Sequence, residues 1–263
     1  MENSPLILQD LSEQILTITL NRPDKLNSIT ESMSLQLQKA LKRAEKTDVR
    51  TVLLTANGKA FCAGQDLAEV VKRSDDPQYE LSATVKKNYN PVIRAIRNLE
   101  KPVVCAVQGT AAGAGANIAF SCDIVFASDD AFFIQSFSKI GLIPDSGGTW
   151  FLPRLAGLAR ANALYMLDEK LTAGKAVECG LIYQSVPADK LQDIARKTCK
   201  KLAVMPTKGY GLYKRALNQS LSNTLDEQLK IEAELQAEAG KSEDYHEGVN
   251  AFLNKRKPKF KGS

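Results

Sequence analysis

Short apolar runs separated by polar turns predict most of the strands in this chain. Residues 15–20 alternate apolar side chains with threonine, as a half-buried strand does, and residues 6–9 join them in a hairpin with its turn at 10–14. Continuous apolar runs at 51–55 and 103–107 predict buried strands. Two more strands are expected at 124–127 and 132–134.

A helical spacing begins after Thr30. Met33, Leu37 and Leu41 recur at every fourth position, so residues 29–46 are expected to form an amphipathic helix with Thr30 as its N-cap. Residues 74–100 begin with a polar stretch that suggests a mobile lid and continue as a helix that Pro91 should bend. Further helices are expected at 114–121, 147–152, 158–167, 173–179, 188–202, 207–220, 225–240 and 243–254.

Strands and helices alternate along the first two hundred residues, whereas the last sixty are helical. Alternation of this kind predicts an α/β fold with parallel strand pairing. The chain has 263 residues, of which 44% are hydrophobic, and this is enough for a complete core. No apolar stretch approaches the length needed to cross a bilayer, and the N-terminus lacks the regions of a targeting segment. We therefore expect a cytoplasmic protein without membrane association.

The cysteine and histidine content narrows the possible chemistry. Five cysteines, without C-x-x-C spacing, are expected to be reduced core residues. His246 is the single histidine, which argues against a zinc site and against a Ser-His-Asp triad. We expect no metal. Catalysis in such a chain must use carboxylates, backbone donors or a thiol.

The net charge is +5, and the one dense basic run is at residues 255–261. A run of this kind is most often a solvated tail, and nucleic-acid binding is the alternative. Phe260 is the only aromatic side chain in the run that could stack on a base, so we expect no nucleic-acid partner.

Two loops of small residues carry the strongest functional signal. They are FCAGQDL at 61–67 and QGTAAGAGAN at 108–117, and each follows a predicted buried strand. Small residues let backbone N–H groups approach a ligand, and two such loops can direct two donors at one oxygen, as an oxyanion hole requires. One such loop alone would indicate only a tight turn. The second loop partly imitates a dinucleotide fingerprint, but its glycines follow the order G-x-x-x-G-x-G.

These loops, with LNRP and LNS at 20–28, Lys101-Pro102, Cys122-Asp123, the 141–149 segment and Leu181, resemble the crotonase superfamily of enoyl-CoA hydratases and isomerases. The resemblance implies a ββα spiral core at 1–200 and a helical trimerisation region at 201–263. It implies an acyl-CoA substrate, no cofactor other than the coenzyme A of that substrate, and a homotrimer or dimer of trimers. The backbone N–H groups of Gln65 and Ala114 would form the oxyanion hole. Coenzyme A would lie along Lys25, Leu26, Ala63, Asp66 and Leu67, and Phe252 and Lys255 of an adjacent subunit would approach its phosphates.

The acid and base positions depart from the hydratase pattern. Hydratases of this family use two glutamates, and the matching positions here hold Asn117 and Phe137, which cannot act as bases near neutral pH. Asp145 remains, in the sequence GLIPDSGGT, and an aspartate there resembles the isomerases of the family, most of all the ring-1,2-epoxyphenylacetyl-CoA isomerase group. Asp145 could instead serve only as a turn residue or helix cap.

An isomerase needs one carboxylate, because the proton taken from one carbon returns to another. Phe137, Leu142, Ile143 and Trp150 would form an apolar pocket that raises the pKa of Asp145. Asn117 would orient a substrate polar group, or else satisfy backbone groups at a helix end. We therefore expect an acyl-CoA isomerase with Asp145 as the proton shuttle. The alternatives are an atypical enoyl-CoA hydratase and a noncatalytic acyl-CoA-binding subunit, and the identity of the acyl group stays open.

Overall fold

The computed structural model describes residues 5–74 and 80–263. A six-stranded sheet runs in the order β1-β2-β3-β5-β7-β10, in which β1 is antiparallel to β2 and all later pairs are parallel. The parallel pairing predicted from the alternation of strands and helices is confirmed. The strands are β1 (Ile7–Ser12), β2 (Ile15–Leu20), β3 (Thr51–Ala56), β5 (Val103–Val107), β7 (Ile124–Ser128) and β10 (Gln184–Val186).

A second sheet has four short strands in the order β4-β6-β8-β9, and only one of them was predicted. They are β4 (Ala60–Cys62), β6 (Thr110–Ala112), β8 (Phe132–Ile134) and β9 (Leu171–Thr172). Strands of two or three residues are too short to produce an alternating pattern, and β6 consists of Thr-Ala-Ala within a glycine-rich loop. This sheet matters for function because β4 and β6 carry the two small-residue loops.

The hairpin between β1 and β2 is tighter than predicted. β1 continues through Ser12, so only Glu13 and Gln14 form the turn, with φ angles of 55° and 61°. Two-residue turns with positive φ match the natural twist of a hairpin. The predicted turn at 10–14 is therefore wrong at its first three residues, which continue the extended strand.

Most helices begin and end close to their predicted positions. The Thr30 hydroxyl accepts a hydrogen bond of 3.2 Å from the Met33 N–H, which confirms Thr30 as the N-cap of α1. The predicted break between residues 152 and 158 is at Gly157, whose φ of 76° and ψ of 159° interrupt α6. The described helices are α1 (Glu31–Arg43), α2 (Leu67–Ser74), α3 (Leu81–Thr84), α4 (Asn90–Asn98), α5 (Ala114–Phe120), α6 (Gly148–Met166), α7 (Ala173–Glu178), α8 (Leu191–Ala203), α9 (Thr207–Ser220), α10 (Leu225–Ala239) and α11 (Glu243–Leu253).

The segment between α2 and α4 is irregular. A π-helical turn, Val85–Tyr89, leads directly into α4, and Pro91, the second residue of α4, has no N–H to donate to the carbonyls of this turn. The change from π-helical to α-helical winding lies where Pro91 was expected to bend the helix. Residues 75–79, which include most of the polar stretch predicted as a lid, lie outside the described residues.

Both faces of the parallel sheet are buried, and this explains why its strands are apolar at nearly every position. Leu53 and Val104 pack with Cys199 of α8 in the smaller of two apolar clusters. Their neighbours Val52 and Cys105 face the opposite way, into the larger cluster beneath α1, α4 and α5.

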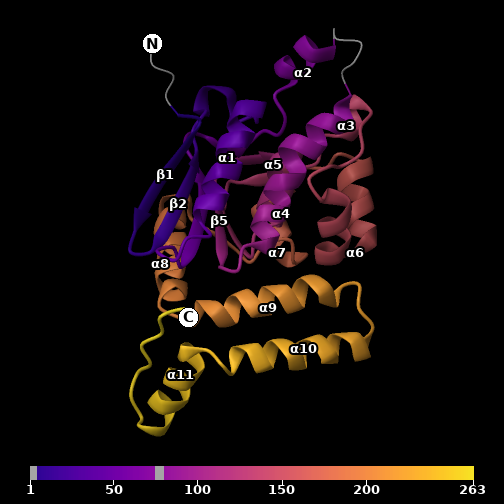
Figure 1. Cartoon of the computed structure of the whole chain (residues 1–263). Helices are drawn as coiled ribbons and strands as arrows, with labels where there is room; N and C mark the ends of the chain where they lie inside the picture. Colours follow the sequence, from indigo (N-terminus) through magenta and orange to yellow (C-terminus); the bar gives the residue numbers. More distant parts are fainter. Residues whose placement is uncertain (1–4, 75–79) are drawn as a thin grey trace.

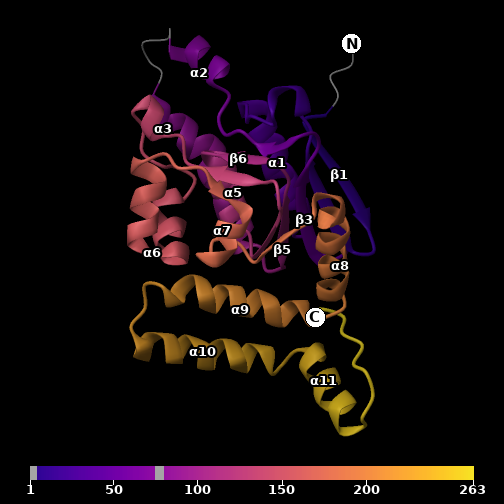
Figure 2. The ribbon, with the colours of Figure 1, turned by 180° about the vertical axis from the view of Figure 1, so that it is seen from behind.

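The last three helices form a layer of their own. Figures 1 and 2 show α9 and α10 side by side along one end of the sheet region, with α11 at the end of this layer. Lys214 of α9 enters the core, where its ammonium donates to the carbonyls of Ile96 (3.1 Å) and Lys101 (3.0 Å) and to the Asp123 carboxylate at 2.7 Å. Arg97 pairs with the same carboxylate at 3.2 Å. Burial lowers the pKa of Lys214, and the Asp123 carboxylate opposes this effect.

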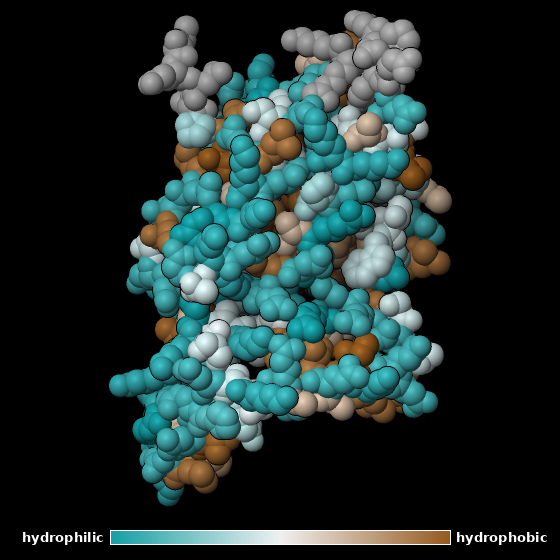
Figure 3. Space-filling model, in the orientation of Figure 1, coloured by the Kyte–Doolittle hydropathy of each residue, from teal (hydrophilic) through white to brown (hydrophobic). Residues whose placement is uncertain are grey.

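Large apolar side chains remain exposed on this helical layer. Leu225 and Leu253 are 73% exposed and Phe252 is 83% exposed, and Figure 3 shows brown apolar atoms along the lower part of the molecule. Among the described helices, none combines the length and the apolar character required to cross a bilayer. A contiguous exposed apolar surface is typical of a protein contact.

The buried ion pairs predict how strongly the helical layer depends on Asp123. Asp123→Asn should lower the free energy of unfolding by about 3 kcal/mol, because it leaves the buried charges of Lys214 and Arg97 without a counter-charge. Urea unfolding measures this loss. Glu13→Gln is the control, since Glu13 pairs with Lys200 at the surface and its loss should leave the unfolding midpoint unchanged. An Asp123→Asn protein as stable as the wild type would contradict the expectation.

Candidate active site

The two small-residue loops lie against each other. The first connects β4 to α2 and turns at Gly64, whose φ is 89°. A Cβ atom at Gly64 would lie 3.0 Å from the Ala112 carbonyl oxygen and 3.7 Å from the Ala114 nitrogen. Only glycine combines this backbone conformation with so close an approach. The residues that the sequence analysis assigned to one oxyanion hole are therefore brought together.

Each loop presents one backbone N–H that is left out of the local pairing. The first loop pairs with Ile29 through the Gly64 carbonyl (2.7 Å) and the Asp66 N–H (3.0 Å), and this pairing does not use the Gln65 N–H. Ala114 is the first residue of α5, and first-turn N–H groups have no acceptor within their own helix. In the described part of the chain, neither N–H has a hydrogen-bond acceptor. Two donors from adjacent loops are thus available to a ligand oxygen.

Helix α5 begins at this point because Gly115 permits close packing on β4. A Cβ at Gly115 would lie 2.5 Å from the Cys62 carbonyl oxygen and 2.6 Å from its Cβ. The Cys62 thiol donates to the Asn27 carbonyl at 3.1 Å, and burial raises the pKa of Cys62 to about 12. Cys62 therefore stays a thiol near neutral pH and is not a nucleophile. This removes the thiol in the first loop from the list of possible catalysts.

The segments predicted to bind coenzyme A are adjacent. The Ala63 N–H donates to the Leu26 carbonyl at 2.9 Å, so residues 25–26 lie beside the first loop, and the Lys25 side chain is exposed. Leu26 itself has a φ of 51°, at the end of a short 3₁₀ turn formed by Pro23–Lys25. Leu67, the first residue of α2, is half exposed.

Asn27 holds the segment around Leu26 against β4, a role that was not predicted from the sequence. Its side chain is fully buried, accepts from the Arg22 N–H at 2.7 Å and donates to the carbonyls of Asn57 (2.9 Å) and Ala60 (2.8 Å). An asparagine tolerates the left-handed conformation found here, with a φ of 54°, better than most residues. The Asn-Ser pair after Leu26 is the signal that could have revealed it.

Asp66 is engaged by protein groups. Its carboxylate pairs with Arg22 at 2.6 Å and accepts from the N–H groups of Ala68 (2.9 Å) and Glu69 (3.3 Å) at the start of α2. Burial raises the pKa of Asp66, but the Arg22 guanidinium and these N–H groups outweigh it and lower the pKa overall. The substrate contact predicted for Asp66 stays a prediction, and in this structure the Asp66 side chain caps α2 and binds Arg22.

The Asp145 turn is fixed from three directions. The Asn117 amide donates to the Asp145 carbonyl at 2.9 Å, the Gly148 N–H donates to the same carbonyl at 2.8 Å, and the Tyr165 hydroxyl donates to the Leu142 carbonyl at 3.1 Å. A Cβ at Gly148 would lie 2.5 Å from the Asn117 amide nitrogen, so glycine is required for this contact. Since Asn117 is on α5, one turn after Ala114, the turn is tied to the helix that presents the second donor.

The Asp145 carboxylate is largely desolvated. Burial raises its pKa to about 6, against the opposing effect of the Ser146 hydroxyl, which donates to the carboxylate at 2.9 Å. A carboxylate with such a pKa is a stronger base than an exposed aspartate and is still ionised at neutral pH. Asp145 can therefore accept and return a proton.

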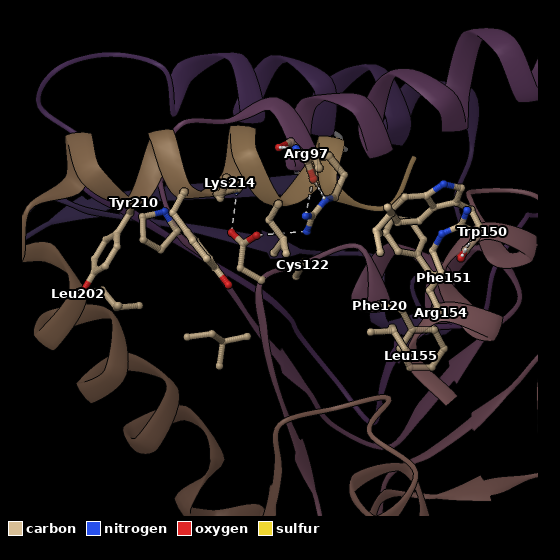
Figure 4. Close-up of a pocket in the computed structure, with 17 residues that line it drawn as sticks. Arg97, Phe120, Cys122, Trp150, Phe151, Arg154, Leu155, Leu202, Tyr210 and Lys214 are labelled. Atoms are coloured by element: carbon tan, nitrogen blue, oxygen red, sulfur yellow. Dashed lines mark hydrogen bonds and ion pairs between the residues drawn. The ribbon is translucent and has the colours of Figure 1, made fainter. Parts of the chain in front are cut away.

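The apolar surroundings differ in part from the prediction. Phe137 is buried and its ring lies against Gly113, but Ile143 is 74% exposed. Trp150 lines a cavity of about 810 Å³ between the sheet region and α9, where the Arg154 guanidinium lies 4.4 Å from its ring centre (Figure 4). Trp150, in the first turn of α6, thus belongs to the lining of this cavity.

Asn117 is also placed differently from the main prediction. Its side chain has no exposed surface, and its oxygen accepts from the Gln135 amide at 3.2 Å while its nitrogen binds the Asp145 carbonyl. This matches the alternative in which the amide satisfies backbone groups. The substrate contact predicted for Asn117 stays a prediction, and both ends of its amide bind protein groups.

Phe252 and Lys255 are remote from these loops. Phe252 belongs to α11 and Lys255 follows it, at the opposite end of the molecule from α2 and α3 (Figure 1). Both side chains are exposed. Within one chain they do not approach Gln65 or Asp145, so the predicted contact with coenzyme A requires a second copy of the chain.

A comparison with known families decides the relationship. The model of the family described as enoyl-CoA hydratase/isomerase matches residues 10–263. The chain belongs to the enoyl-CoA hydratase/isomerase family. A 1,2-epoxyphenylacetyl-CoA isomerase of Escherichia coli (strain K12) is 49% identical over 257 residues, which cover 97% of this chain and 98% of that protein.

Other relatives carry hydratase names. A protein of Rhodobacter capsulatus named "Probable enoyl-CoA hydratase" is 42% identical over 256 residues, which cover 97% of this chain and 98% of that protein. The crystal structure of an enoyl-CoA hydratase from Bacillus anthracis has a TM-score of 0.91 at 30% identity and covers 98% of this chain and all of that one. The predicted crotonase fold is confirmed, and the chain is a crotonase-type acyl-CoA isomerase or hydratase.

The raised pKa of Asp145 predicts a pH-dependent cost in stability. A folded pKa of about 6 against an unfolded value near 4 means that the folded protein binds more protons between these values, so its stability falls as pH rises through this window. Asp145→Asn should therefore be more stable than the wild type at pH 8, by up to about 3 kcal/mol, with no gain at pH 4. Urea unfolding at both pH values measures the difference.

Asp66→Asn is the matched control of opposite sign. Because the folded structure lowers the pKa of Asp66, its charge stabilises the fold at pH 8, and that contribution is lost as pH falls through the folded pKa. Asp66→Asn should thus be less stable than the wild type at pH 8. A loss of stability at pH 8 in Asp145→Asn as well would contradict the desolvation of Asp145.

Proposed function

We propose that this enzyme is an acyl-CoA isomerase that moves a proton within an unsaturated or ring-containing coenzyme A thioester. The observation that carries this proposal is a single desolvated carboxylate, Asp145, tied through Asn117 to the helix whose first N–H is free to bind an oxygen. The positions at which family hydratases hold their two glutamates contain an amide and a phenyl ring.

The Gln65 and Ala114 N–H groups donate to the carbonyl oxygen of the thioester. When a proton leaves a carbon conjugated with this carbonyl, negative charge moves to the oxygen, and preorganised donors stabilise the enolate. Loss of one such donor typically slows a reaction by ~10²–10³. The donors are backbone groups, so their placement depends on the glycines of the loops rather than on a side chain.

Asp145 supplies the proton transfer. Its carboxylate removes a proton from one carbon, and the carbon–hydrogen electron pair moves through the conjugated system to the carbonyl oxygen. The neutral Asp145 then returns the proton to another carbon as the enolate collapses, and the double bond has moved. One group serves as base and then as acid, so no second carboxylate is needed.

The relatives support an isomerase and suggest one substrate. The 49% identical protein is named for its action on 1,2-epoxyphenylacetyl-CoA. We therefore propose 2-(1,2-epoxy-1,2-dihydrophenyl)acetyl-CoA, an intermediate of phenylacetate breakdown, as the specific candidate substrate. The hydratase names of other relatives favour an atypical hydratase as the second candidate. A noncatalytic acyl-CoA-binding subunit is the third outcome that experiments must separate.

The proposed binding mode needs a neighbouring copy of the chain. Coenzyme A lies along Lys25, Leu26, Ala63 and Leu67, and its phosphates reach Phe252 and Lys255 of an adjacent subunit. The exposed apolar side chains of the α9–α11 layer supply the contact surface for a homotrimer or a dimer of trimers. No cofactor takes part apart from the coenzyme A of the substrate.

Replacement of Asp145 tests the reaction. Asp145→Asn should lower turnover by about 10²–10⁴ and leave the affinity for substrate largely intact, because only the base is lost. In wild type, kcat/KM should rise with pH through an apparent pKa of about 6, since Asp145 must be ionised to accept a proton. Mass spectrometry on a panel of coenzyme A thioesters, including the ring epoxide, measures product formation.

The same assay separates the three candidate functions. An isomerase gives a product of unchanged mass and exchanges substrate hydrogen with solvent deuterium, a hydratase adds one water, and a binding subunit gives no product. Asp130→Asn, which neutralises an exposed carboxylate outside the site, serves as the control and should keep wild-type turnover. Wild-type turnover by Asp145→Asn would refute the assigned base.

Lys255 tests the contribution of the neighbouring subunit. Lys255→Ala should weaken coenzyme A binding by about tenfold, the usual effect of losing one charged contact of ~1.4 kcal/mol, as measured by calorimetry. Lys257→Ala removes the same charge two residues further along and should bind normally. Light scattering should give three or six times the chain mass. A monomer at micromolar concentration would contradict the assembly, and normal binding by Lys255→Ala would contradict the role of the lysine.

A further inference from the structure

Gln135 lies directly behind the candidate site and has no role in the mechanism so far. It follows β8, its side chain is only 3% exposed, and its amide nitrogen donates to the Asn117 oxygen at 3.2 Å. The preceding residue, Ile134, accepts a 2.9 Å hydrogen bond from the Gly113 N–H, immediately before Ala114. Gln135 thus contacts the start of α5 through both its backbone neighbour and its side chain.

One contact decides the orientation of both amides. The Asp145 carbonyl can only accept, so Asn117 must present its nitrogen there and its oxygen to Gln135. Gln135 must then present its own nitrogen, and its oxygen is left buried without a hydrogen-bond partner among the described residues. An unpaired buried oxygen is unfavourable, so this arrangement is more costly than an apolar side chain of the same shape would be. A requirement at Asn117 explains why an amide is present at position 135.

We infer that Gln135 is a positioning residue for proton transfer by Asp145. The inference rests on the proposed function, and it adds a chain of two amides that runs from β8 to the Asp145 turn. With Gln135 as donor, the Asn117 oxygen is held away from Asp145. Without that donor, the buried Asn117 oxygen has no partner, and the amide keeps only one of its two hydrogen bonds, so it holds the Asp145 turn less firmly.

The consequence of this lost anchor is a shift of the catalytic base. The Asp145 turn is tied to α5 by Asn117, so loss of the contact changes the position of the carboxylate relative to the Ala114 N–H. A misplacement of about 1 Å can lower a rate ~10²-fold. The segments proposed to bind coenzyme A, around Leu26 and Ala63, are held by other hydrogen bonds and should keep their positions.

Gln135→Met tests this inference because methionine has a similar length and no donor. We expect kcat to fall by about 10–100-fold, while KM changes by less than about threefold because substrate binding is preserved. The decisive experiment is a double-mutant cycle with Asn117→Ala. If Gln135 acts only through Asn117, then Gln135→Met should have no further effect on kcat in the Asn117→Ala protein.

Two further variants serve as a substitute and as a control in this test. Gln135→Asn retains the amide but shortens its reach, so it should lower kcat as Gln135→Met does. It replaces Gln135→Met in the test if that variant fails to fold. Gln192→Met is the matched control, since it removes a 2.8 Å amide hydrogen bond from α8 to Thr55, away from the Asp145 turn, and should keep wild-type kcat. Circular dichroism and thermal unfolding show that each variant is folded at the assay temperature.

Wild-type kcat in folded Gln135→Met would overturn the inference. Additive effects of Gln135→Met and Asn117→Ala would also overturn it, as would a rise in KM with unchanged kcat. Asp145→Asn separates these failures from failure of the proposed function. If Asp145→Asn is inactive while Gln135→Met is normal, only the positioning role is wrong, whereas an active Asp145→Asn shows that the proposed mechanism itself is wrong.

Discussion

The close contact between two glycine-containing loops is the constraint on which the rest of the site depends. A side chain at Gly64 would meet the backbone at Ala112, and one at Gly115 would meet Cys62. The second sheet exists largely to bring these loops together, because β4 and β6 pair directly beneath them. Two backbone donors can then approach one oxygen, and no side chain substitution elsewhere could create this geometry.

The same packing explains why a carboxylate so close to the loops is poorly solvated. The Asp145 carbonyl binds a fully buried amide, that of Asn117, and burial of the Asp145 carboxylate raises its pKa to about 6. The raised pKa of Asp145 lowers the stability of the folded protein, and it makes the carboxylate a stronger base. A stability cost of this kind at a functional position is common, since catalysis needs groups that the fold alone would not favour.

Much of this fold follows from local patterns, and most of the errors have local causes. The strand at Val103–Val107 and the cap at Thr30 are confirmed because uniform apolarity and capping are read over a few residues. The β4 and β6 strands were missed because they are short and rich in small residues, whereas the equally short β8 is Phe-Phe-Ile and was predicted. The ion pair between Asp66 and Arg22 and the place of Trp150 in the lining of a cavity were not predicted, since the direction of a side chain depends on partners that are distant in sequence. The roles assigned to Gln65, Ala114 and Asp145 stay predictions, although the structure brings their segments together.

The departure from the hydratase pattern at residue 117 has a structural consequence as well as a chemical one. A glutamate or aspartate there would supply an acid, but an ionised carboxylate could not donate a hydrogen bond to the Asp145 carbonyl. Asparagine removes the acid and adds the donor, and Gln135 then fixes the orientation of that donor. The amide at 117 and the carboxylate at 145 are therefore best understood as one arrangement, in which Asn117 holds the turn that carries the proposed base.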